Sequence, residues 1–298
     1  MGDKNVFDIE LSLPNAKLSS KEATLLGFDV RYARASNQLR LLLEQSQLIA
    51  WNKKFHGGQL ALTELVAEQY PFIIFHGDVG TGKTATAECI ANRLIRESKQ
   101  EDCVLFKLSN RVRGSGMVGE MGTLLVEAFQ KVTAAAGKSR RCILLIDEGD
   151  SLAASRAQAQ SHHEDKVAVN TLIQGIDDLR RLQGRVLVIL CTNRSSALDP
   201  ALLRRAALIE EFRRPDDKEL RRLFEMDLGA LKPTSPQLTR LVQLASAREG
   251  RPAWTYSDIR TRLYPAALSA AFPASALSFE HLIAAAETIF PSPVVENR

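Results

Sequence analysis

A run of glycines followed by lysine and threonine is the first feature of this 298-residue sequence with a clear chemical use. The run is Gly77, Asp78, Val79, Gly80, Thr81, Gly82, Lys83 and Thr84, continued by Ala85, and it has the spacing G-x-x-x-x-G-K-S/T. Glycine suits a loop whose backbone amides turn inward around a phosphate, at dihedral angles that a side chain resists. Lys83 offers a point charge for the β and γ phosphates, and the Thr84 hydroxyl suits an octahedral Mg²⁺ ion. The run therefore predicts a loop that binds ATP and Mg²⁺.

Two adjacent carboxylates, Asp147 and Glu148, lie at the end of the apolar run CILLID that begins at Cys142, with Asp147 as its last residue. The carboxyl edge of a parallel sheet faces the crevice in which ligands bind. One carboxylate can hold Mg²⁺ through its water shell while its neighbour polarises the attacking water. We predict the first role for Asp147 and the second for Glu148. For Asp150 the favoured interpretation is the N-cap of a helix that contains Leu152, and a role in the site is the alternative.

The apolar run VLVILCT from Val186 leads directly to Asn193. In a P-loop sheet this strand lies between the strand that carries the glycine loop and the strand that carries Asp147. An amide in that place can donate to a phosphate and accept from water. We therefore predict that Asn193 contacts the γ phosphate and the attacking water, with a simple turn at the strand end as the alternative.

Five short apolar runs must position these side chains. They are PFIIFH from Pro71, CVLFKL from Cys103, CILLID from Cys142, VLVILCT from Val186 and ALIEEF from Ala207. Runs that are continuous rather than alternating are typical of strands buried on both faces. Segments with apolar residues at helical spacing separate the first four runs. The pattern predicts an α/β fold, with a parallel five-stranded sheet and helices on both of its faces.

The pattern changes after residue 214, where Pro215 and Asp216 offer a stop and a helix N-cap. Four amphipathic stretches follow, starting near Asp217, Ser235, Tyr256 and Ser278. At the other end of the chain, VFDIELSLP from Val6 alternates like an edge strand. We therefore expect an N-terminal extension at 1–20, a large P-loop domain at 21–214 and a small helical lid domain at 215–298.

Composition and charge exclude several classes of protein. The formal net charge of +4 and the pI of 8.9 are only mildly basic for this length, so nucleic acid is a weakly supported partner. No apolar run approaches the ~20 residues that cross a bilayer, and the first ten residues do not resemble a signal peptide, so we expect a cytoplasmic protein. The four cysteines show no CxxC spacing and are predicted to be reduced core residues.

With the P-loop, the DEGD segment and CTNRSSALDPALLRRA in this order, the chain resembles the AAA+ ATPases. The resemblance runs from about residue 22 to residue 290, and it implies a P-loop domain with a helical lid, assembled as a homohexameric ring. It also implies that Arg204 or Arg205 reaches the γ phosphate of the neighbouring subunit, with Arg205 slightly favoured. Arg260 in YSDIRTR matches the position of the second sensor. The Gly-Arg-Phe segment of many AAA proteins is replaced by Ala206 and the residues that follow it.

Two segments narrow the resemblance to the pachytene-checkpoint ATPases, which remodel HORMA-domain proteins. They are HEDKVAVNTLIQGIDDLRR and TNRSSALDPALLRRAALIEEFRRPD. Bacterial members of this group accompany a HORMA protein and a cyclic-oligonucleotide synthase, which is a nucleotidyltransferase, in antiphage signalling. The resemblance implies that the motor opens the closed HORMA protein and so silences the synthase. It also places Met117, Val118 and Gly119 in the first pore loop, and the polar stretch from Arg156 to His163 in the second.

Three other functions stay open at this point. A nucleic-acid-dependent ATPase of the loader type would require Lys and Arg where the pore loop has Met117 and Val118. A general AAA+ unfoldase would use the same residues on a broader range of proteins. A nucleotide-dependent scaffold would not require the water-activating carboxylate of Glu148. The sequence therefore favours a hydrolysing motor that acts on a partner protein.

Overall fold

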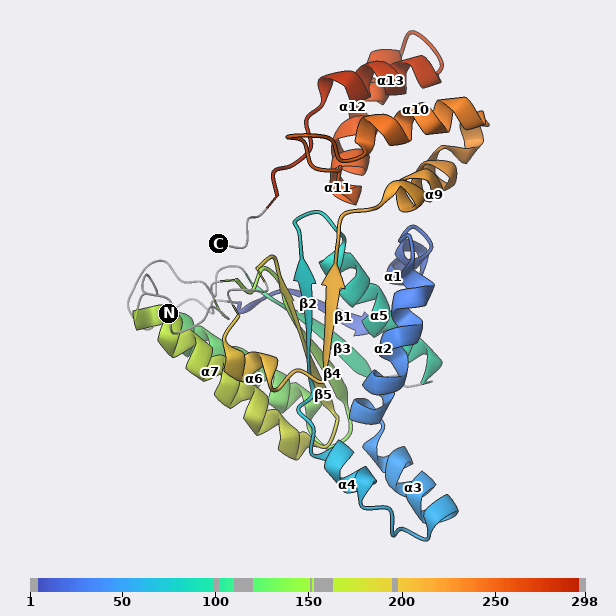
Figure 1. Cartoon of the computed structure of the whole chain (residues 1–298). Coiled ribbons are helices and arrows are strands. Elements are labelled where there is room, and N and C mark those ends of the chain that lie inside the picture. Colours follow the sequence, from blue (N-terminus) through green and yellow to red (C-terminus); the bar gives the residue numbers. More distant parts are fainter. Residues whose placement is uncertain are drawn as a thin grey trace. The chain divides into compact units, whose positions relative to one another are not determined.

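A computed structural model describes residues 5–98, 102–109, 120–150, 152, 163–194 and 198–294 of the chain. These residues form two compact units. The first comprises the described residues of Met1–His76 and Thr84–Glu211, and the second comprises those of Gly77–Lys83 and Phe212–Glu296. Figure 1 shows the helices and strands of both. The glycine loop thus has its contacts mainly with the C-terminal helices.

In chain order, the elements up to the last strand are β1 (Phe7–Leu13), α1 (Ala16–Glu22), α2 (Phe28–Leu43), α3 (Gln45–His56), α4 (Leu62–Ala67), β2 (Phe72–Gly77), α5 (Lys83–Glu97), β3 (Cys103–Leu108), α6 (Glu120–Ala136), β4 (Arg141–Ile146), α7 (His163–Leu179), β5 (Val186–Thr192), α8 (Pro200–Leu203) and β6 (Leu208–Phe212). They are followed by α9 (Asp217–Leu228), α10 (Ser235–Ala245), α11 (Tyr256–Asp258), a π-helical turn (Ile259–Leu263), α12 (Tyr264–Ala271) and α13 (Phe279–Thr288). Helix and strand therefore alternate through the sheet, and helices follow it.

Within the part of the chain that the structure describes, the sheet has six strands in the order β1-β3-β4-β5-β2-β6. Strands β3, β4, β5 and β2 pair in parallel, and β1 pairs antiparallel with β3. All five strands predicted from continuous apolar runs are present, and β5 lies between β2 and β4 as predicted. The predicted total of five is one too low, because the alternating segment from Val6 joins the sheet and covers the edge of β3.

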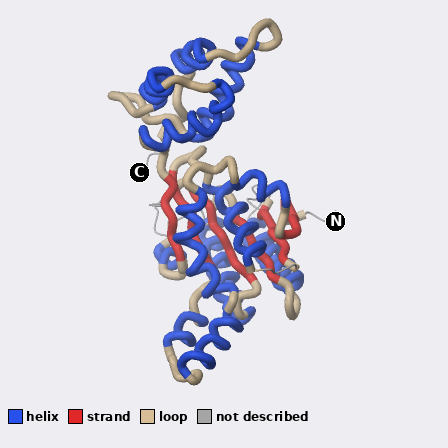
Figure 2. Tube along the Cα trace, turned by 90° about the vertical axis from the view of Figure 1, so that its right-hand side faces the viewer, coloured by secondary structure: helices blue, strands red, loops and turns tan. Residues whose placement is uncertain are grey.

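Helices cover both faces of this sheet, with α6 and α7 on one face and α2 and α5 on the other (Figures 1 and 2). Side chains of α6 and α7 share one hydrophobic core with alternate residues of the strands, including Ile74, Leu144 and Val188. The whole of β4 and of β5 is buried. Burial on both faces explains why these strands have continuous apolar sequences. It also fixes the carboxyl ends of β4 and β5, where the predicted site residues begin.

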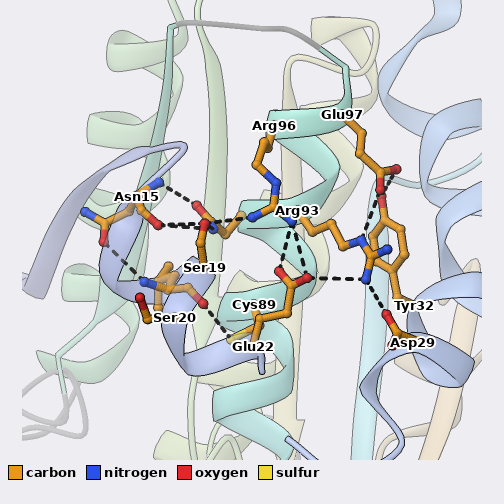
Figure 3. A network of polar contacts seen from close by, with 12 residues as sticks. Asn15, Ser19, Ser20, Glu22, Asp29, Tyr32, Cys89, Arg93, Arg96 and Glu97 are labelled. Atoms are coloured by element: carbon orange, nitrogen blue, oxygen red, sulfur yellow. Dashed lines mark hydrogen bonds and ion pairs between the residues drawn. The ribbon is translucent and has the colours of Figure 1, made fainter. Parts of the chain in front are cut away.

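The N-terminal segment is attached to α5, the helix that follows the glycine loop. The fully buried Asn92 amide donates to the Asn15 carbonyl at 3.2 Å and accepts from the Asn15 amide at 2.6 Å. Further along α5, Arg93 contacts carboxylates from α1 and from α2 (Figure 3). A buried amide that satisfies two backbone groups is costly to remove. These contacts therefore hold α1 and α2 against α5.

The C-terminal helices begin where the sequence predicted them, at Asp217, Ser235, Tyr256 and Phe279. Asp216 caps the first of these helices in a capping box with Glu219, whose backbone N–H donates to Asp216 at 2.8 Å. Across the described ranges, no helix is both long and apolar enough to span a membrane. All four cysteines are free and buried, as predicted. Burial raises the pKa of Cys89 to about 12 and that of Cys142 to about 11, so these thiols are inert packing groups.

Candidate nucleotide-binding site

The glycine loop connects β2 to α5, and the side chain of Lys83 bonds to the backbone of the loop itself. Lys83 is 7% exposed, and its Nζ donates to the carbonyls of Gly77 and Asp78 at 2.9 and 2.8 Å. The Thr81 hydroxyl donates to the Asp78 carbonyl at 2.7 Å. These bonds hold the ammonium group inside the curve of the loop, next to the first turn of α5. The positive end of a helix adds to its charge there, so the loop suits a phosphate group.

The same loop is fixed to the C-terminal helices at Gly80. Gly80 has a φ of +75°, and a Cβ on it would lie 2.7 Å from the Thr255 hydroxyl and 2.8 Å from the Ser257 Cβ. The Ser257 amide donates to the Gly80 carbonyl at 3.1 Å. Only glycine combines this backbone conformation with so close a neighbour. The start of α11 therefore helps to shape the phosphate loop.

Arg214 makes a second attachment, which the sequence did not predict. Its guanidinium donates to the Asp78 carboxylate and to the carbonyls of Ala253, Ser292 and Pro293, and its side chain is only 10% exposed. The partners are spread from the loop to the end of the described chain, so no local motif identifies this residue. Arg214 therefore bonds the C-terminal segments to the loop and orients the Asp78 carboxylate.

Thr84 and Asp147 come together at the start of α5, as a magnesium site requires. The Thr84 hydroxyl donates to Asp147 Oδ1 at 2.7 Å, and the Glu148 amide donates to the same oxygen at 3.0 Å. Lys107 Nζ lies 2.9 Å from the other oxygen, Oδ2. Burial tends to raise the pKa of the Asp147 carboxyl, but the hydrogen bonds from Lys107 and Thr84 outweigh it and hold that pKa below its usual value. A hydroxyl beside an ionised carboxylate is the oxygen set that Mg²⁺ prefers, so these residues fit the ion.

Glu148 is presented to solvent by an unusual backbone conformation. Its φ is +48°, the left-handed region that side chains other than glycine seldom occupy, and its side chain is exposed. Next to it, Gly149 leaves no room for a side chain, because a Cβ would lie 2.2 Å from Leu190 Cδ1. The Gly149 amide also donates to the Cys191 carbonyl at 2.8 Å. Strained residues of this kind cluster at functional sites, and here the turn directs a carboxylate outward.

Asn193 lies at the end of β5 and is held by Asp150. The Asp150 carboxylate accepts from the Asn193 backbone amide at 2.8 Å and from its side-chain amide at 3.2 Å. The Thr192 hydroxyl donates to the same carboxylate. Most of the helix that Asp150 was predicted to cap lies outside the described residues. The structure shows that the Asp150 carboxylate orients the predicted sensor, a contact that the sequence analysis did not name.

Comparisons with known proteins agree with this geometry. Residues 73–214 match the AAA family, described as the ATPase family associated with various cellular activities. The chain is 62% identical to CD-NTase-associated protein 6 of Escherichia coli strain KTE188, over 99% of each chain. The chain belongs to the CD-NTase-associated protein 6 family of AAA ATPases. It is therefore an ATPase that binds nucleotide, as the sequence predicted.

Solved structures give the same assignment. The chain is similar to one in the E. coli MS115-1 HORMA:CdnC:Trip13 complex, with a TM-score of 0.87, 36% identity and 97% coverage of both chains. It is also similar to Rhizobiales Trip13, with a TM-score of 0.70, 31% identity and coverage of 96% and 99%. The resemblance to the pachytene-checkpoint group that the sequence indicated is thus confirmed.

The two arginines of the predicted finger differ in their surroundings. Arg205 Nε and Nη2 donate to the two carboxylate oxygens of Asp177 at 2.6 and 2.9 Å, and its guanidinium lies 5.2 Å from the centre of the Tyr70 ring. The hydrogen bond to Asp177 holds the pKa of Arg205 above its ordinary value. Arg204, the neighbouring residue, is exposed. Arg205 is therefore paired within its own chain, whereas Arg204 is exposed.

The remaining predicted site residues are Arg260, in the C-terminal helices, and the pore-loop residues. Arg260 donates to both oxygens of Asp227 at 2.9 and 2.8 Å, within the C-terminal helices, where it follows the start of the π-helical turn. Met117, Val118 and Gly119, predicted for the first pore loop, fall outside the described residues, as does most of the predicted second loop.

Proposed function

We propose that this chain is the ATP-hydrolysing subunit of a homohexameric ring that remodels a HORMA-domain protein. The observation that carries the chemistry is the contact of Thr84 with Asp147 at 2.7 Å beside an outward-facing Glu148. The partner is supported by the 36% identical chain found in a HORMA:CdnC:Trip13 complex. The ring would work in the cytoplasm, where ATP is supplied.

Each residue of the site has a distinct task in this reaction. The glycine loop and Lys83 bind the β and γ phosphates, and Thr84 and Asp147 hold Mg²⁺. The ion supplies positive charge to the phosphate oxygens when it is bound. Glu148 orients the attacking water and accepts its proton, and Asn193 donates to the phosphoryl oxygen that gains charge.

Arg204 is the better candidate for the residue that acts on the neighbouring subunit. A finger must be able to reach across an interface, and Arg205 would first have to break a bidentate pair with Asp177. An exposed guanidinium has no such obstacle. Arg204 therefore makes hydrolysis depend on assembly of the ring.

The assembled ring would act on the HORMA protein by pulling on a segment of it. Met117, Val118 and Gly119 offer an apolar, adaptable grip on a peptide, without preference for its sequence. Opening the closed HORMA protein would release the nucleotidyltransferase that it activates, and so end the antiphage signal.

The test is ATP hydrolysis by the wild type and by Glu148→Gln, with a HORMA protein, with DNA, or with neither. We expect the HORMA protein to stimulate the wild type. Glu148→Gln should hydrolyse about 10³-fold more slowly but still bind ATP, because general bases contribute about 10²- to 10⁴-fold. Glu127→Gln removes a carboxylate from the α6 surface and serves as the matched control. Stimulation by DNA alone would overturn the remodelling function and favour a nucleic-acid-dependent motor.

A further inference from the structure

Lys107 approaches the magnesium carboxylate from the neighbouring strand. It pairs in register with Leu145 across β3 and β4, so its side chain reaches forward to Asp147 at the carboxyl edge. Its Nζ is 2.9 Å from Asp147 Oδ2, with side-chain exposures of 22% for the lysine and 19% for the aspartate. Neither the glycine-loop motif nor the Asp147–Glu148 pair calls for a lysine at this position of β3.

The two oxygens of Asp147 have different kinds of partner. Oδ1 accepts from the Thr84 hydroxyl and from the Glu148 amide, and it is the oxygen on the side where a magnesium ligand is expected. Oδ2 is bonded to the Lys107 ammonium. The lysine thus fixes the orientation of the carboxylate without occupying the oxygen that faces Thr84.

The charge of Lys107 matters as much as its position. A lysine ammonium is positive at neutral pH, and that of Lys107 lies 2.9 Å from Asp147 Oδ2, so the pair carries no net charge. A divalent cation that arrives alone meets a carboxylate already balanced by a cation, whereas one that arrives with ATP brings the negative phosphates with it.

We propose that Lys107 is a positioning residue that orients Asp147 and makes binding of the divalent cation depend on the nucleotide. This inference rests on the proposed role of Asp147 as the magnesium carboxylate. Without Lys107, Asp147 would carry an unbalanced negative charge beside Thr84 and would attract the cation by itself. With Lys107 present, the site binds free Mg²⁺ weakly and binds the ion when it arrives as Mg–ATP.

The test is Mn²⁺ binding to the full chain without nucleotide, followed by electron paramagnetic resonance. We expect Lys107→Met to bind Mn²⁺ about tenfold more tightly than the wild type. This is the effect of removing a unit charge ~6 Å from a divalent ion in a water-like medium. Lys107→Arg keeps the charge and should behave like the wild type. Lys131→Met removes a lysine that pairs with Glu127 on α6, and it should leave Mn²⁺ binding unchanged.

The outcome separates a role in metal binding from a merely structural one. If Lys107→Met has a wild-type melting temperature and binds Mn²⁺ no more tightly than the wild type, the proposal is overturned. Tighter binding that is restored to the wild-type value in Lys107→Arg supports it.

Asp147→Asn distinguishes this inference from the function on which it rests. Combined with Lys107→Met, Asp147→Asn should abolish the gain in Mn²⁺ affinity. If Asp147→Asn alone leaves ATP hydrolysis intact, the assignment of the magnesium carboxylate fails. If it abolishes hydrolysis while Lys107→Met leaves Mn²⁺ binding unchanged, only the role of Lys107 fails.

Discussion

Two clusters of charged side chains lie against α5, and they are built in different ways. Along the helix, Arg93 bonds to Glu22, Asp29 and Glu97, and the Tyr32 hydroxyl donates to Glu97 at 2.6 Å (Figure 3). We call this the Arg93 cluster. It joins α5 to α1 and α2, and its guanidinium also lies 4.5 Å from the centre of the Tyr32 ring.

The other cluster, at the start of α5, consists of Thr84, Asp147 and Lys107, and we call it the Asp147 cluster. Its central hydrogen bond joins the neutral Thr84 hydroxyl to Asp147 Oδ1. The hydroxyl oxygen and Oδ1 can each give up this hydrogen bond and bind a metal ion instead, and no charge is then left unpaired. In the Arg93 cluster, a guanidinium bonded to three carboxylates offers no such exchange. A cluster of paired charges therefore does not by itself mark a functional site. What marks it is a polar group whose partner can be replaced by a ligand.

The largest expected effect is a loss of ATP turnover, and it should occur for only one of the two arginines that follow α8. Arg204→Ala should lower ATP turnover by about 10³-fold, because an arginine finger contributes that much or more, and it should leave the melting temperature unchanged. Arg205→Ala should instead lower the melting temperature, because it removes the bidentate pair with Asp177. Turnover and thermal unfolding are measured on both variants, with the exposed Arg181→Ala as control. Loss of turnover without destabilisation in Arg205→Ala would reverse the assignment.

A smaller effect is expected at Asp150, which holds the sensor Asn193. Asp150→Ala frees the Asn193 amide and should lower kcat by about 10- to 100-fold, since a small misplacement near the chemistry costs up to ~10²-fold. The Kd for ATP should change less than about threefold. Steady-state kinetics and ATP binding are compared with Asp178→Ala, which removes an exposed carboxylate from α7. An unchanged kcat would mean that Asp150 only stabilises the turn.

Removing the centre of the Arg93 cluster should affect stability rather than chemistry. Arg93→Ala should lower the free energy of unfolding by about 2 kcal/mol, the scale of hydrogen bonds to charged groups. ATP turnover at 25 °C should stay within about twofold. Denaturant unfolding measures the first effect, with Arg240→Ala as control, because its exposed pair with Glu287 should contribute less than about 1 kcal/mol. A turnover loss above about tenfold in folded protein would show that the two clusters are coupled.

The smallest effect is a dependence of stability on pH at Glu97. Burial tends to raise the pKa of this carboxyl, but hydrogen bonds from Tyr32 and Arg93 outweigh it and hold the pKa below its usual value. The stabilisation is therefore complete above the unfolded pKa of about 4.3 and is lost as the pH falls through the lower folded value. The difference in unfolding free energy between wild type and Glu97→Gln should be constant at pH 6 to 8. It should shrink below about pH 4, and a constant difference throughout would contradict the assignment.

The position of β5 between β2 and β4, and the shared magnesium role proposed for Thr84 and Asp147, could be predicted from the sequence. Each prediction depends on a short continuous stretch of sequence, which is either an apolar run or a motif. Recognising the glycine-loop motif indicates the type of sheet, and the sheet type indicates where the stretch lies. The sixth strand was visible too, as the alternation from Val6, but a strand of this kind does not reveal whether it joins the main sheet.

The residues that support the site could not be predicted in the same way. Asp150 is separated from Asn193 by 43 positions, and Arg214 from Asp78 by 136, so no local spacing connects the partners. Lys107 looked like one polar residue in an apolar strand. The preference for Arg205 over Arg204 likewise rested on position alone, whereas their different surroundings appear only when α7 is folded against α8.

The measurement that tests the central claim most directly is the disassembly of a labelled HORMA–nucleotidyltransferase complex, followed by fluorescence anisotropy. Wild-type protein with ATP and Mg²⁺ should separate the two partners at a rate that rises with the concentration of the motor. Glu148→Gln should bind the complex and leave it intact. Equal disassembly by the variant, or none by a hydrolysing wild type, would contradict a motor that uses this site to remodel a HORMA protein.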